Sequence, residues 1–280
     1  MDSITNPCQE RGFQLSSMAP PLKWPGGKRW LVCLQGNLFP KQFNRLVEPF
    51  AGGAAAFFHL SPRRAWLNDL NADLIETYQA IAEDWGAVFK TLEDYQRKHC
   101  SEFYYRIRAT KPRSLAARSA KFLYLNRTCF NGLYRVNLRG EFNVPIGTKS
   151  SVLLEDDDFE TLSARLRGAR LTAWDFERVV DATGEGDFIF ADPPYTVRHN
   201  LNGFIKYNER LFSWADQERL RDALFRARDR GAYVVLSNAD HKSIRELYER
   251  AAEIRVVSRR SVMAASSANR KSTSELLIRV

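Results

Sequence analysis

The sequence predicts an α/β fold in which a mostly parallel sheet is interrupted by a long helical insertion. Short apolar runs that end in turn residues alternate with stretches of helical period near both ends of the chain, whereas a long central stretch shows only helical period. The 280 residues suffice for one large α/β domain with a smaller module inside it. We expect a leader over residues 1–20, an α/β domain over 21–83 and 152–280, and an insertion over 84–151.

The first part of the chain has a β-α-β-α pattern. Apolar residues in 44–50 lead into Ala51-Gly52-Gly53, which indicates a strand followed by a tight turn, and residues 54–60 suit a helix. A second strand is expected over 64–67, and apolar residues at helical spacing follow over 70–81.

The central insertion has two parts. Residues 84–126 are helical in pattern and rich in Arg, Lys and Tyr, over a length that exceeds an ordinary connection. Residues 130–147 contain Asn-Gly, Arg-Gly and Pro-Ile-Gly turn signals between short strand-like pieces, which indicates a β-hairpin or a long structured loop. We expect this second part to contact a partner.

The α/β pattern resumes after the insertion. The expected elements are strands at 170–173, 187–191 and 232–236, an amphipathic helix at 214–230, and two closing strands at 254–257 and 275–280.

The charge balance suits a polyanionic partner. Lys and Arg number 42 against 33 Asp and Glu, a net charge of +9 that fits nucleic acid but also simple solubility. No apolar run approaches the roughly 20 residues of a membrane-spanning helix, so we expect a soluble protein without membrane contact. Residues 1–20 lack the apolar segment of a secretory signal and predict a flexible leader.

Metal and disulfide chemistry are not indicated. The four cysteines, Cys8, Cys33, Cys100 and Cys129, are far apart and form no C-x-x-C pair, which favours reduced intracellular thiols. The four histidines are equally scattered, so we expect no structural metal.

Asp192-Pro193-Pro194-Tyr195 is the strongest chemical motif, because it follows the predicted strand 187–191 at the sheet edge where α/β folds bind ligands. An exocyclic amine of a nucleobase is a poor nucleophile because its lone pair is delocalised. The Asp192 carboxylate and the Pro193 carbonyl can accept its two N–H bonds, and Tyr195 offers a face on which an extruded base can stack. The alternative interpretation is a strand-terminating turn.

Two further elements fit a nucleotide-like cofactor. Glu48-Pro49-Phe50-Ala51-Gly52-Gly53 lets the backbone approach a ligand closely, although such glycines also form plain turns. Asp69 ends the next strand, where a carboxylate can accept the hydroxyls of a ribose, or cap the following helix.

The third element is Lys23-Trp24-Pro25-Gly26-Gly27-Lys28. It is not a Walker A loop, because Leu22 stands where the first glycine would be. Trp24 can cover an adenosine or attract a sulfonium, and Lys28 can bind a carboxylate; the alternative is an exposed loop anchored by Trp24.

Together these motifs resemble the Dam-type (D12 class) DNA adenine-N6 methyltransferases, in which the cofactor motif precedes the helical insertion and the Asp-Pro-Pro-Tyr motif follows it. The resemblance runs from Leu22 to the C-terminus. It includes Lys-Trp-x-Gly-Gly-Lys at 23–28, Val-Glu-Pro-Phe at 47–50, Asn-Asp-Leu-Asn at 68–71, Tyr-Leu-Asn-Arg at 124–127 and most of the stretch 131–145.

The resemblance implies a Rossmann-like S-adenosylmethionine-dependent methyltransferase sheet with an inserted DNA-recognition module and β-hairpin. The implied cofactor-binding residues are Trp24, Gly27, Lys28, Pro49, Phe50, Gly52, Asp69 and Asp192, and the implied catalytic residues are Asp192, Pro193, Pro194 and Tyr195. The implied DNA-binding residues are Lys23, Asn131, Leu133, Arg135, Asn137, Arg139, Pro145, Arg259 and Arg260.

The resemblance also suggests how duplex DNA is read. Arg135 would read a guanine edge and Leu133 would wedge into the duplex. Arg259-Arg260-Ser261 and Asn269-Arg270-Lys271 resemble a basic loop that contacts phosphates, or form a solvent-facing surface. Retention of Lys23 and Arg135 suggests GATC as the target site, while Phe130 and Thr148-Lys149 depart from the family's commonest pattern.

The expected activity is methyl transfer from S-adenosylmethionine to adenine N6 in flipped-out bases, by a monomer in the cytoplasm of a bacterial or phage-infected cell, near the nucleoid. Four alternatives stay open. Cytosine N4 presents the same amine geometry; cytosine C5 methylation would need Cys8 as nucleophile; a noncatalytic DNA-binding protein would not need Asp192, Tyr195, Lys28 and Asp69; and structured RNA also presents phosphates.

Overall fold

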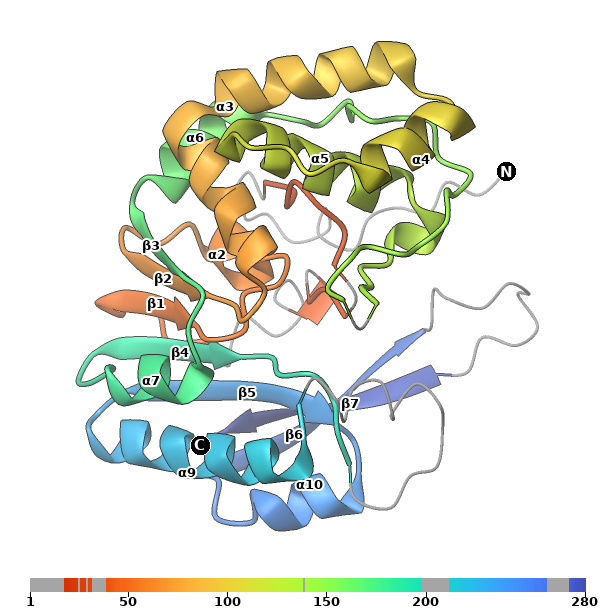
Figure 1. Ribbon diagram of the computed structural model, residues 1–280. Helices are drawn as coiled ribbons and strands as arrows, with labels where there is room; N and C mark the ends of the chain where they lie inside the picture. Colours follow the sequence, from red (N-terminus) through yellow and green to blue (C-terminus); the bar gives the residue numbers. More distant parts are fainter. Residues whose placement is uncertain are drawn as a thin grey trace, which may run out of the picture. The chain divides into compact units, whose positions relative to one another are not determined.

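The computed structural model describes residues 18–24, 26–28, 30–31, 39–137, 139–197, 212–260 and 272–280. Most of the expected leader therefore lies outside the described residues. The chain divides into two compact units, one formed by Met1–Gly36 and Ala51–Ala173 and the other by Asn37–Phe50 and Trp174–Val280 (Figure 1).

The described strands form a seven-stranded sheet in the order β3-β2-β1-β4-β5-β7-β6. Strand β7 is antiparallel to β5 and β6, whereas the β2–β3, β1–β4 and β4–β5 pairs are parallel. All the strands expected from the sequence are confirmed, with bounds that shift by at most a few residues. They are β1 (Arg45–Glu48), β2 (Ala65–Asn68), β3 (Ala169–Thr172), β4 (Asp187–Ala191), β5 (Tyr233–Ala239), β6 (Glu253–Arg260) and β7 (Ser272–Arg279).

The first unit is mainly helical around the β2–β3 pair. Its helices are α2 (Ala55–Leu60), α3 (Ala72–Lys98), α4 (Ser101–Ala109), α5 (Leu115–Thr128), the 3₁₀ turn η2 (Phe130–Gly132) and α6 (Phe159–Leu166). Helix α3 packs against both α5 and α6. The expected helices before and within the insertion are confirmed, while α6 was not predicted.

Helix α3 runs across the expected start of the insertion. Its backbone leaves helical geometry at Asp84 (φ −148°, ψ 74°), and the Asp84 carboxylate then accepts the N–H of Ala87 at 3.0 Å. Asp84 thus caps the second segment of a kinked helix, so one helix connects the β2–β3 region with the inserted helices.

Residues 130–147 form a structured loop with hairpin character. Two isolated antiparallel bridges, Cys129↔Ile146 and Val136↔Phe142, take the place of a continuous ladder. The base of the loop is closed by hydrogen bonds from Phe130 N to Pro145 O (2.9 Å) and from Gly147 N to Thr128 O (2.8 Å). The sequence left open a β-hairpin or a long structured loop, and the segment has features of both.

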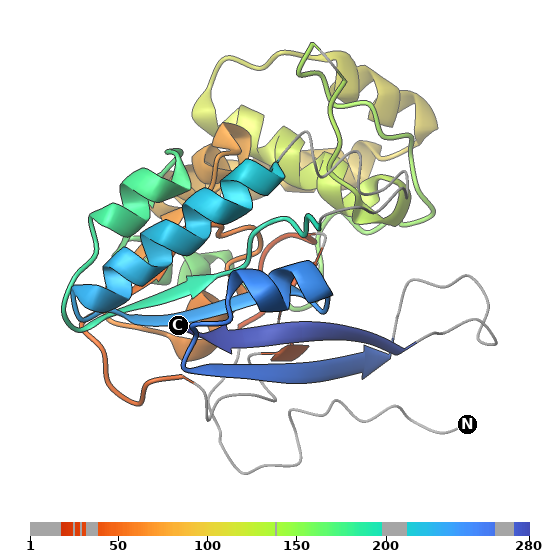
Figure 2. The same ribbon diagram turned by 90° about the horizontal axis from the view of Figure 1, so that it is seen from below.

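The second unit is a sheet with helices on it. Helices α7 (Phe176–Asp181) and α9 (Trp214–Asp229) lie side by side on one face, and α10 (Lys242–Leu247) follows β5 (Figure 2). Helix α9 was predicted, and it begins with a capping box between Ser213 and Asp216. The shorter α7 and α10 were not predicted.

The core of this unit explains the apolar run before the Asp-Pro-Pro-Tyr motif. Phe188, Ile189, Phe190 and Ala191 on β4 are at most 2% exposed, as expected for a parallel strand covered on both faces. Such a strand is held rigidly, so the residues that follow it are placed by the core.

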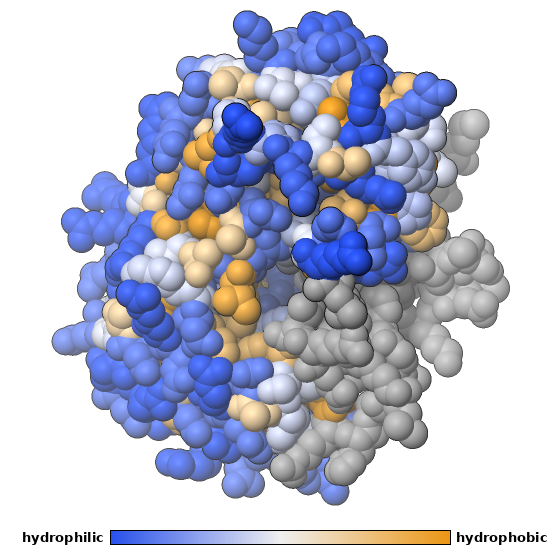
Figure 3. All heavy atoms as spheres, in the orientation of Figure 1, coloured by the Kyte–Doolittle hydropathy of each residue, from blue (hydrophilic) through white to orange (hydrophobic). Residues whose placement is uncertain are grey.

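The outer surface is mainly polar on the face that Figure 3 shows, with apolar residues scattered among charged ones. Within the described residues, no helix is long and apolar enough to cross a membrane. The same part of the chain contains no group of three metal-binding side chains.

Candidate active site

The Asp192-Pro193-Pro194-Tyr195 segment leaves the sheet of the second unit at the carboxyl end of β4. Parallel pairing of β1 with β4 sets Val47 opposite Ile189, so the end of β1 at Glu48 lies at the same sheet edge. This is the edge where open α/β sheets bind ligands. Asp192 is partly exposed, as a residue that contacts a substrate must be.

The Asp192 carboxylate is oriented by a neighbouring strand. Ser237 on β5 donates its hydroxyl hydrogen to Asp192 Oδ1 at 2.5 Å, and Ser237 itself is fully buried. Because β4 and β5 pair with Ala191 opposite Leu236, the two side chains follow adjacent positions of the ladder. A charge-assisted bond of this kind fixes the rotamer of a carboxylate.

Tyr195 is held through its hydroxyl. The phenol donates to Glu275 Oε2 at 2.9 Å, and Glu275 is a buried residue on β7. Burial, followed by the negative charges of Asp192 and Glu275, raises the pKa of Tyr195 well above its ordinary value. The phenol therefore stays protonated and remains a donor at any physiological pH.

A buried amide pair supports the turn itself. Gln217 on α9 donates its Nε2 hydrogens to the carbonyls of Pro194 (3.5 Å) and Thr196 (3.4 Å), and Asn238 Nδ2 donates to Gln217 Oε1 at 3.0 Å. Gln217 and Asn238 are both fully buried. Among the described residues, no group donates to the Pro193 carbonyl, which directly precedes the Pro194 carbonyl that Gln217 engages.

The sequence reasoning missed Ser237, Gln217, Asn238 and Glu275. A signal existed for three of them, because Ser237-Asn238 follows an apolar run at the ligand-binding edge and Glu275 directly precedes the apolar run of β7. Gln217 gave no signal, since a Gln in an amphipathic helix looks like solvent-facing surface.

The first unit carries the glycine turn expected at a cofactor site. Gly52 has φ +46°, its N–H donates to Asp69 Oδ2 at 2.9 Å, and its carbonyl accepts the buried hydroxyl of Tyr78 at 2.7 Å. Both backbone groups of Gly52 are thus satisfied by side chains, which fixes the turn.

Asp69 lies at the carboxyl end of β2 and is partly exposed. Its second oxygen accepts the N–H of Asn71 at 2.9 Å. Helix α3 is capped by the Asn71 side chain, which accepts from Leu74 N at 3.1 Å. Asp69 is therefore not the N-cap. Burial raises its pKa, and the two backbone N–H groups of Asn71 and Gly52 offset part of this rise.

Trp24 stands against the Gly52 turn. A methyl group added at Gly52 would lie 2.6 Å from Trp24 Cδ1, so the indole and the turn are in close contact. Lys28 is buried, and its ammonium donates to Gly26 O at 3.0 Å, while Gly27 N donates to Trp24 O at 3.1 Å. Trp24, Gly52 and Asp69 are thus brought together by the first unit.

Pro49 and Phe50 belong to the second unit, directly after β1. Phe50 packs its ring against Phe176 (centroids 5.3 Å apart) and Phe212 (5.5 Å). This cluster explains why an aromatic residue follows strand β1, and it fixes the chain that leaves the sheet.

The predicted DNA-binding residues of the first unit lie at one loop and the segment beside it. Lys23, Asn131, Arg135, Arg139 and Pro145 are exposed, while Leu133 and Asn137 are half-buried. Phe130, noted in the sequence only as a departure from the family pattern, is 50% exposed. An exposed aromatic ring at the start of this loop is a candidate contact that the sequence reasoning did not include.

The loop is ordered by its own polar groups. Arg135 Nε donates to Asn143 Oδ1 at 2.8 Å, and Asn137 Oδ1 accepts the N–H groups of Arg139 (2.9 Å) and Glu141 (3.0 Å). The Asn137 amide therefore shapes the turn, and its DNA contact stays a prediction. The side chains of Arg259 and Arg260, on β6, and the segment Asn269-Arg270-Lys271 lie outside the described residues.

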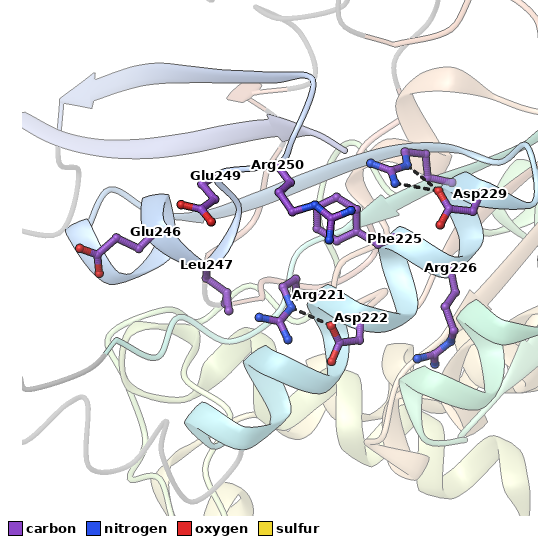
Figure 4. A pocket seen from close by; sticks show the side chains of 10 residues that line it. Arg221, Asp222, Phe225, Arg226, Asp229, Glu246, Leu247, Glu249 and Arg250 are labelled. Carbon is purple, nitrogen blue, oxygen red and sulfur yellow. Dashed lines mark hydrogen bonds and ion pairs between the residues drawn. The ribbon is translucent and has the colours of Figure 1, made fainter.

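A separate pocket of about 450 Å³ lies on the second unit between α9 and the end of α10 with the residues that follow it (Figure 4). Its arginines are engaged by neighbours, with Arg221 Nε bonded to Asp222 (2.8 Å), Arg228 to Asp229 (2.7 Å), and Arg250 over the Phe225 ring. It contains none of the predicted site residues, and its balanced charges do not define a ligand.

The sheet order with an antiparallel β7, the glycine turn backed by an acid, and the acidic motif after β4 define a Rossmann-like methyltransferase fold. A family model described as D12 class N6 adenine-specific DNA methyltransferase matches residues 24–263. The chain belongs to this family and is an adenine-specific DNA methyltransferase. The resemblance drawn from the sequence motifs is thereby confirmed.

Named relatives agree with this assignment. The chain is 35% identical over 242 residues to a type II methyltransferase, M1.LlaDCHI, of Lactococcus lactis subsp. cremoris, which covers 83% of this chain and 85% of the relative. It is 32% identical to a DNA adenine methylase of Haemophilus influenzae, over 87% of each chain. A DNA adenine methylase of Escherichia coli K12 is 30% identical over 91% of this chain and 93% of the relative.

Proposed function

We propose that this protein transfers a methyl group from S-adenosylmethionine to N6 of an adenine that is flipped out of duplex DNA, at GATC sites. The observation that carries the proposal is the construction of the Asp192–Tyr195 segment. Within four residues it combines an oriented carboxylate, a Pro193 carbonyl to which no described group donates, and an anchored aromatic ring. That set matches the needs of an exocyclic amine rather than those of a turn.

The first unit supplies groups that fit the cofactor. The Asp69 carboxylate suits ribose hydroxyls, the Gly52 turn lets backbone approach a ligand, Trp24 offers an indole face for an adenosine or sulfonium, and the buried Lys28 ammonium suits a carboxylate. Bound S-adenosylmethionine would supply an electrophilic methyl group. Gly27, Pro49 and Phe50 complete the proposed cofactor set.

In the proposed reaction, Asp192 and the Pro193 carbonyl accept the two N–H bonds of the adenine amine, which localises its lone pair for attack. The Ser237 hydrogen bond keeps the carboxylate in one orientation. Tyr195 stacks on the flipped base, recovering about 1–3 kcal/mol of the lost stacking, and Pro194 keeps the turn closed through Gln217. Positioning and charge then supply most of the acceleration.

DNA recognition is assigned to the loop 130–147 and the Lys23 segment. Arg135 is proposed to read a guanine edge, because Asn143 engages only its Nε and the described residues bond neither terminal nitrogen. Leu133 is proposed as the wedge that stabilises the flipped state, and Asn131, Asn137, Arg139 and Pro145 as neighbouring contacts. Arg259 and Arg260 are proposed to contact phosphates. We infer that the protein acts as a monomer near the bacterial nucleoid.

The proposal is tested by expressing the chain in a host without adenine methylation and sequencing its DNA with long reads. We expect N6-methyladenine in one sequence context, and Asp192→Ala should lose about 10²–10³-fold or more in rate while binding duplex within a few-fold of wild type. Asp229→Asn, an exposed change on α9, serves as the control. Unmodified adenine, or full activity in Asp192→Ala, would overturn the proposal.

A further inference from the structure

The half-buried Tyr134 lies between Leu133 and Arg135, the two proposed DNA-reading residues, yet its ring is engaged by other parts of the first unit. It stacks on Trp24, with centroids 5.5 Å apart and an interplanar angle of 27°, and packs on Phe122 at 5.3 Å. Its hydroxyl donates to Asp73 Oδ2 at 3.3 Å, at the start of helix α3. One residue therefore joins the DNA-reading loop to the Trp24 segment and to α3.

The Trp24 indole also contacts the proposed cofactor turn at Gly52. The space at Gly52 that a methyl group would occupy is filled by the indole, at 2.6 Å, and Gly52 in turn bonds Asp69. Continuous contacts therefore run from the proposed ribose acceptor Asp69 through Gly52 and Trp24 to Tyr134. Because these groups pack directly on one another, a displacement of one of them changes the contacts of the next.

A second connection runs beside the ring stack. Asn126 on α5 binds the backbone of Lys23 twice, accepting from Lys23 N at 2.8 Å and donating to Lys23 O at 2.7 Å. Gly132, with φ +63°, packs so closely on the Lys23 side chain that an added methyl would lie 3.2 Å from Lys23 Cβ. The segment before Trp24 and the turn before Leu133 thus share one anchor.

We propose that Tyr134 couples cofactor binding to DNA recognition: a cofactor that fixes Trp24 fixes the Leu133–Arg135 loop through the Tyr134 ring. This inference rests on the proposed function of both ends. Linkage requires the effect to be reciprocal, so specific DNA tightens cofactor binding by the same factor, which for such couplings is typically about 5–150-fold. Tyr134 is a positioning residue in this scheme, since it acts through Trp24 and Arg135.

The experiment measures a thermodynamic cycle of cofactor and duplex binding with the full chain. Dissociation constants for S-adenosylhomocysteine, with and without duplex, and for duplex, with and without S-adenosylhomocysteine, give one coupling factor for each variant. Wild type should show a factor of about 5 or more. Tyr134→Phe keeps the ring and should retain it, whereas Tyr134→Ala should bring the factor close to 1.

Two further variants separate coupling from folding. Phe142 packs on Tyr134 at 5.8 Å from within the loop, and we expect Phe142→Ala to weaken duplex binding while the coupling factor stays near that of wild type. Tyr134→Leu keeps apolar bulk if Tyr134→Ala does not fold, and it should also lose the coupling because Leu cannot stack on Trp24.

The outcomes distinguish this inference from the function on which it rests. Wild-type protein that binds both ligands with a coupling factor of 1, or Tyr134→Leu with an unchanged factor, would overturn the inference alone. Wild-type protein that binds neither ligand would overturn the proposed function as well.

Discussion

The phenol of Tyr195 donates to the Glu275 carboxylate at 2.9 Å, although the two residues are 80 positions apart in the sequence. Glu275 belongs to β7, the strand that is antiparallel to its neighbours, so the last strand of the sequence supports the aromatic ring of the Asp-Pro-Pro-Tyr motif. We expect Glu275→Ala to remove this hydrogen bond to a charged acceptor, which contributes about 1.5–3 kcal/mol, and to lower kcat roughly tenfold or more.

The same pair has an informative conservative variant. Glu275→Gln retains an acceptor oxygen and should keep most of the activity, and Tyr195→Phe should lose less than Tyr195→Ala because the ring face remains. Steady-state methylation of a duplex oligonucleotide measures these differences. Equal losses in Glu275→Ala and Glu275→Gln would show that the hydrogen bond does not position Tyr195.

Gln217 should support catalysis without touching the substrate. Gln217→Leu fills the same space but leaves the Asn238 amide and the Pro194 and Thr196 carbonyls without their partner, so the free energy of unfolding should fall by about 1–3 kcal/mol. A displaced turn should lower kcat with little change in KM for DNA. Asp222→Asn, on the exposed side of the same helix, is the control and should behave as wild type.

Gly52→Ala should abolish tight cofactor binding. The substitution combines a positive φ of +46° with a methyl group 2.6 Å from the Trp24 ring, so the indole must move. Gly140→Ala separates the two effects, because Gly140 also has a positive φ (+75°) but open space around its added methyl. Calorimetric titration with S-adenosylhomocysteine should show a large loss for Gly52→Ala only; similar losses in both would point to backbone strain alone.

Cofactor affinity should depend on pH through Asp69. Its pKa is raised by burial above the ordinary 3.8, so the ionised form, which we propose accepts the ribose hydroxyls, is lost at a higher pH than for an exposed aspartate. Affinity should therefore fall on acidification through the raised pKa and level off above it. The effect of Asp69 on stability has the opposite sign, because the folded state binds this proton more tightly than the unfolded chain. Its contribution to the free energy of unfolding is therefore largest at low pH and is lost as the pH rises through the folded pKa.

Asp69→Asn is the matched variant for this dependence. It should bind S-adenosylhomocysteine more weakly than wild type at neutral pH and show a flatter profile on acidification. A wild-type profile in Asp69→Asn would assign the titration to another group.

Arg127 should contribute strongly to stability. Its guanidinium bonds both oxygens of Asp157 (2.6 and 2.7 Å) and the carbonyls of Pro21 and Val152, and its side chain is 2% exposed. Arg127→Met leaves the Asp157 charge buried and unpaired, so unfolding in urea should show a loss of about 3–5 kcal/mol. Lys242→Ala removes an exposed ion pair with Glu246 and should change stability by less than about 1 kcal/mol.

The sequence by itself determined most of the strand and helix order and the chemical motif. Short apolar runs such as Phe188–Ala191 that are bounded by turn residues indicate buried strands, and the turn residues after them mark the sheet edge where ligands bind. These signals are local, so they can be recognised without knowledge of the fold. The short helices α6, α7 and α10 were not predicted, because six to eight residues carry too little periodicity.

Only the tertiary structure decided which residues support the motif. Ser237, Gln217, Asn238 and Glu275 act through hydrogen bonds between elements that are 21 to 80 residues apart, and no local pattern distinguishes a Gln that holds a carbonyl from one that faces solvent. The same holds for Tyr134, whose neighbours in sequence are assigned to DNA while its ring belongs to the Trp24 stack. Long-range pairing depends on the register of the sheet and the packing of helices, which a single sequence does not specify residue by residue.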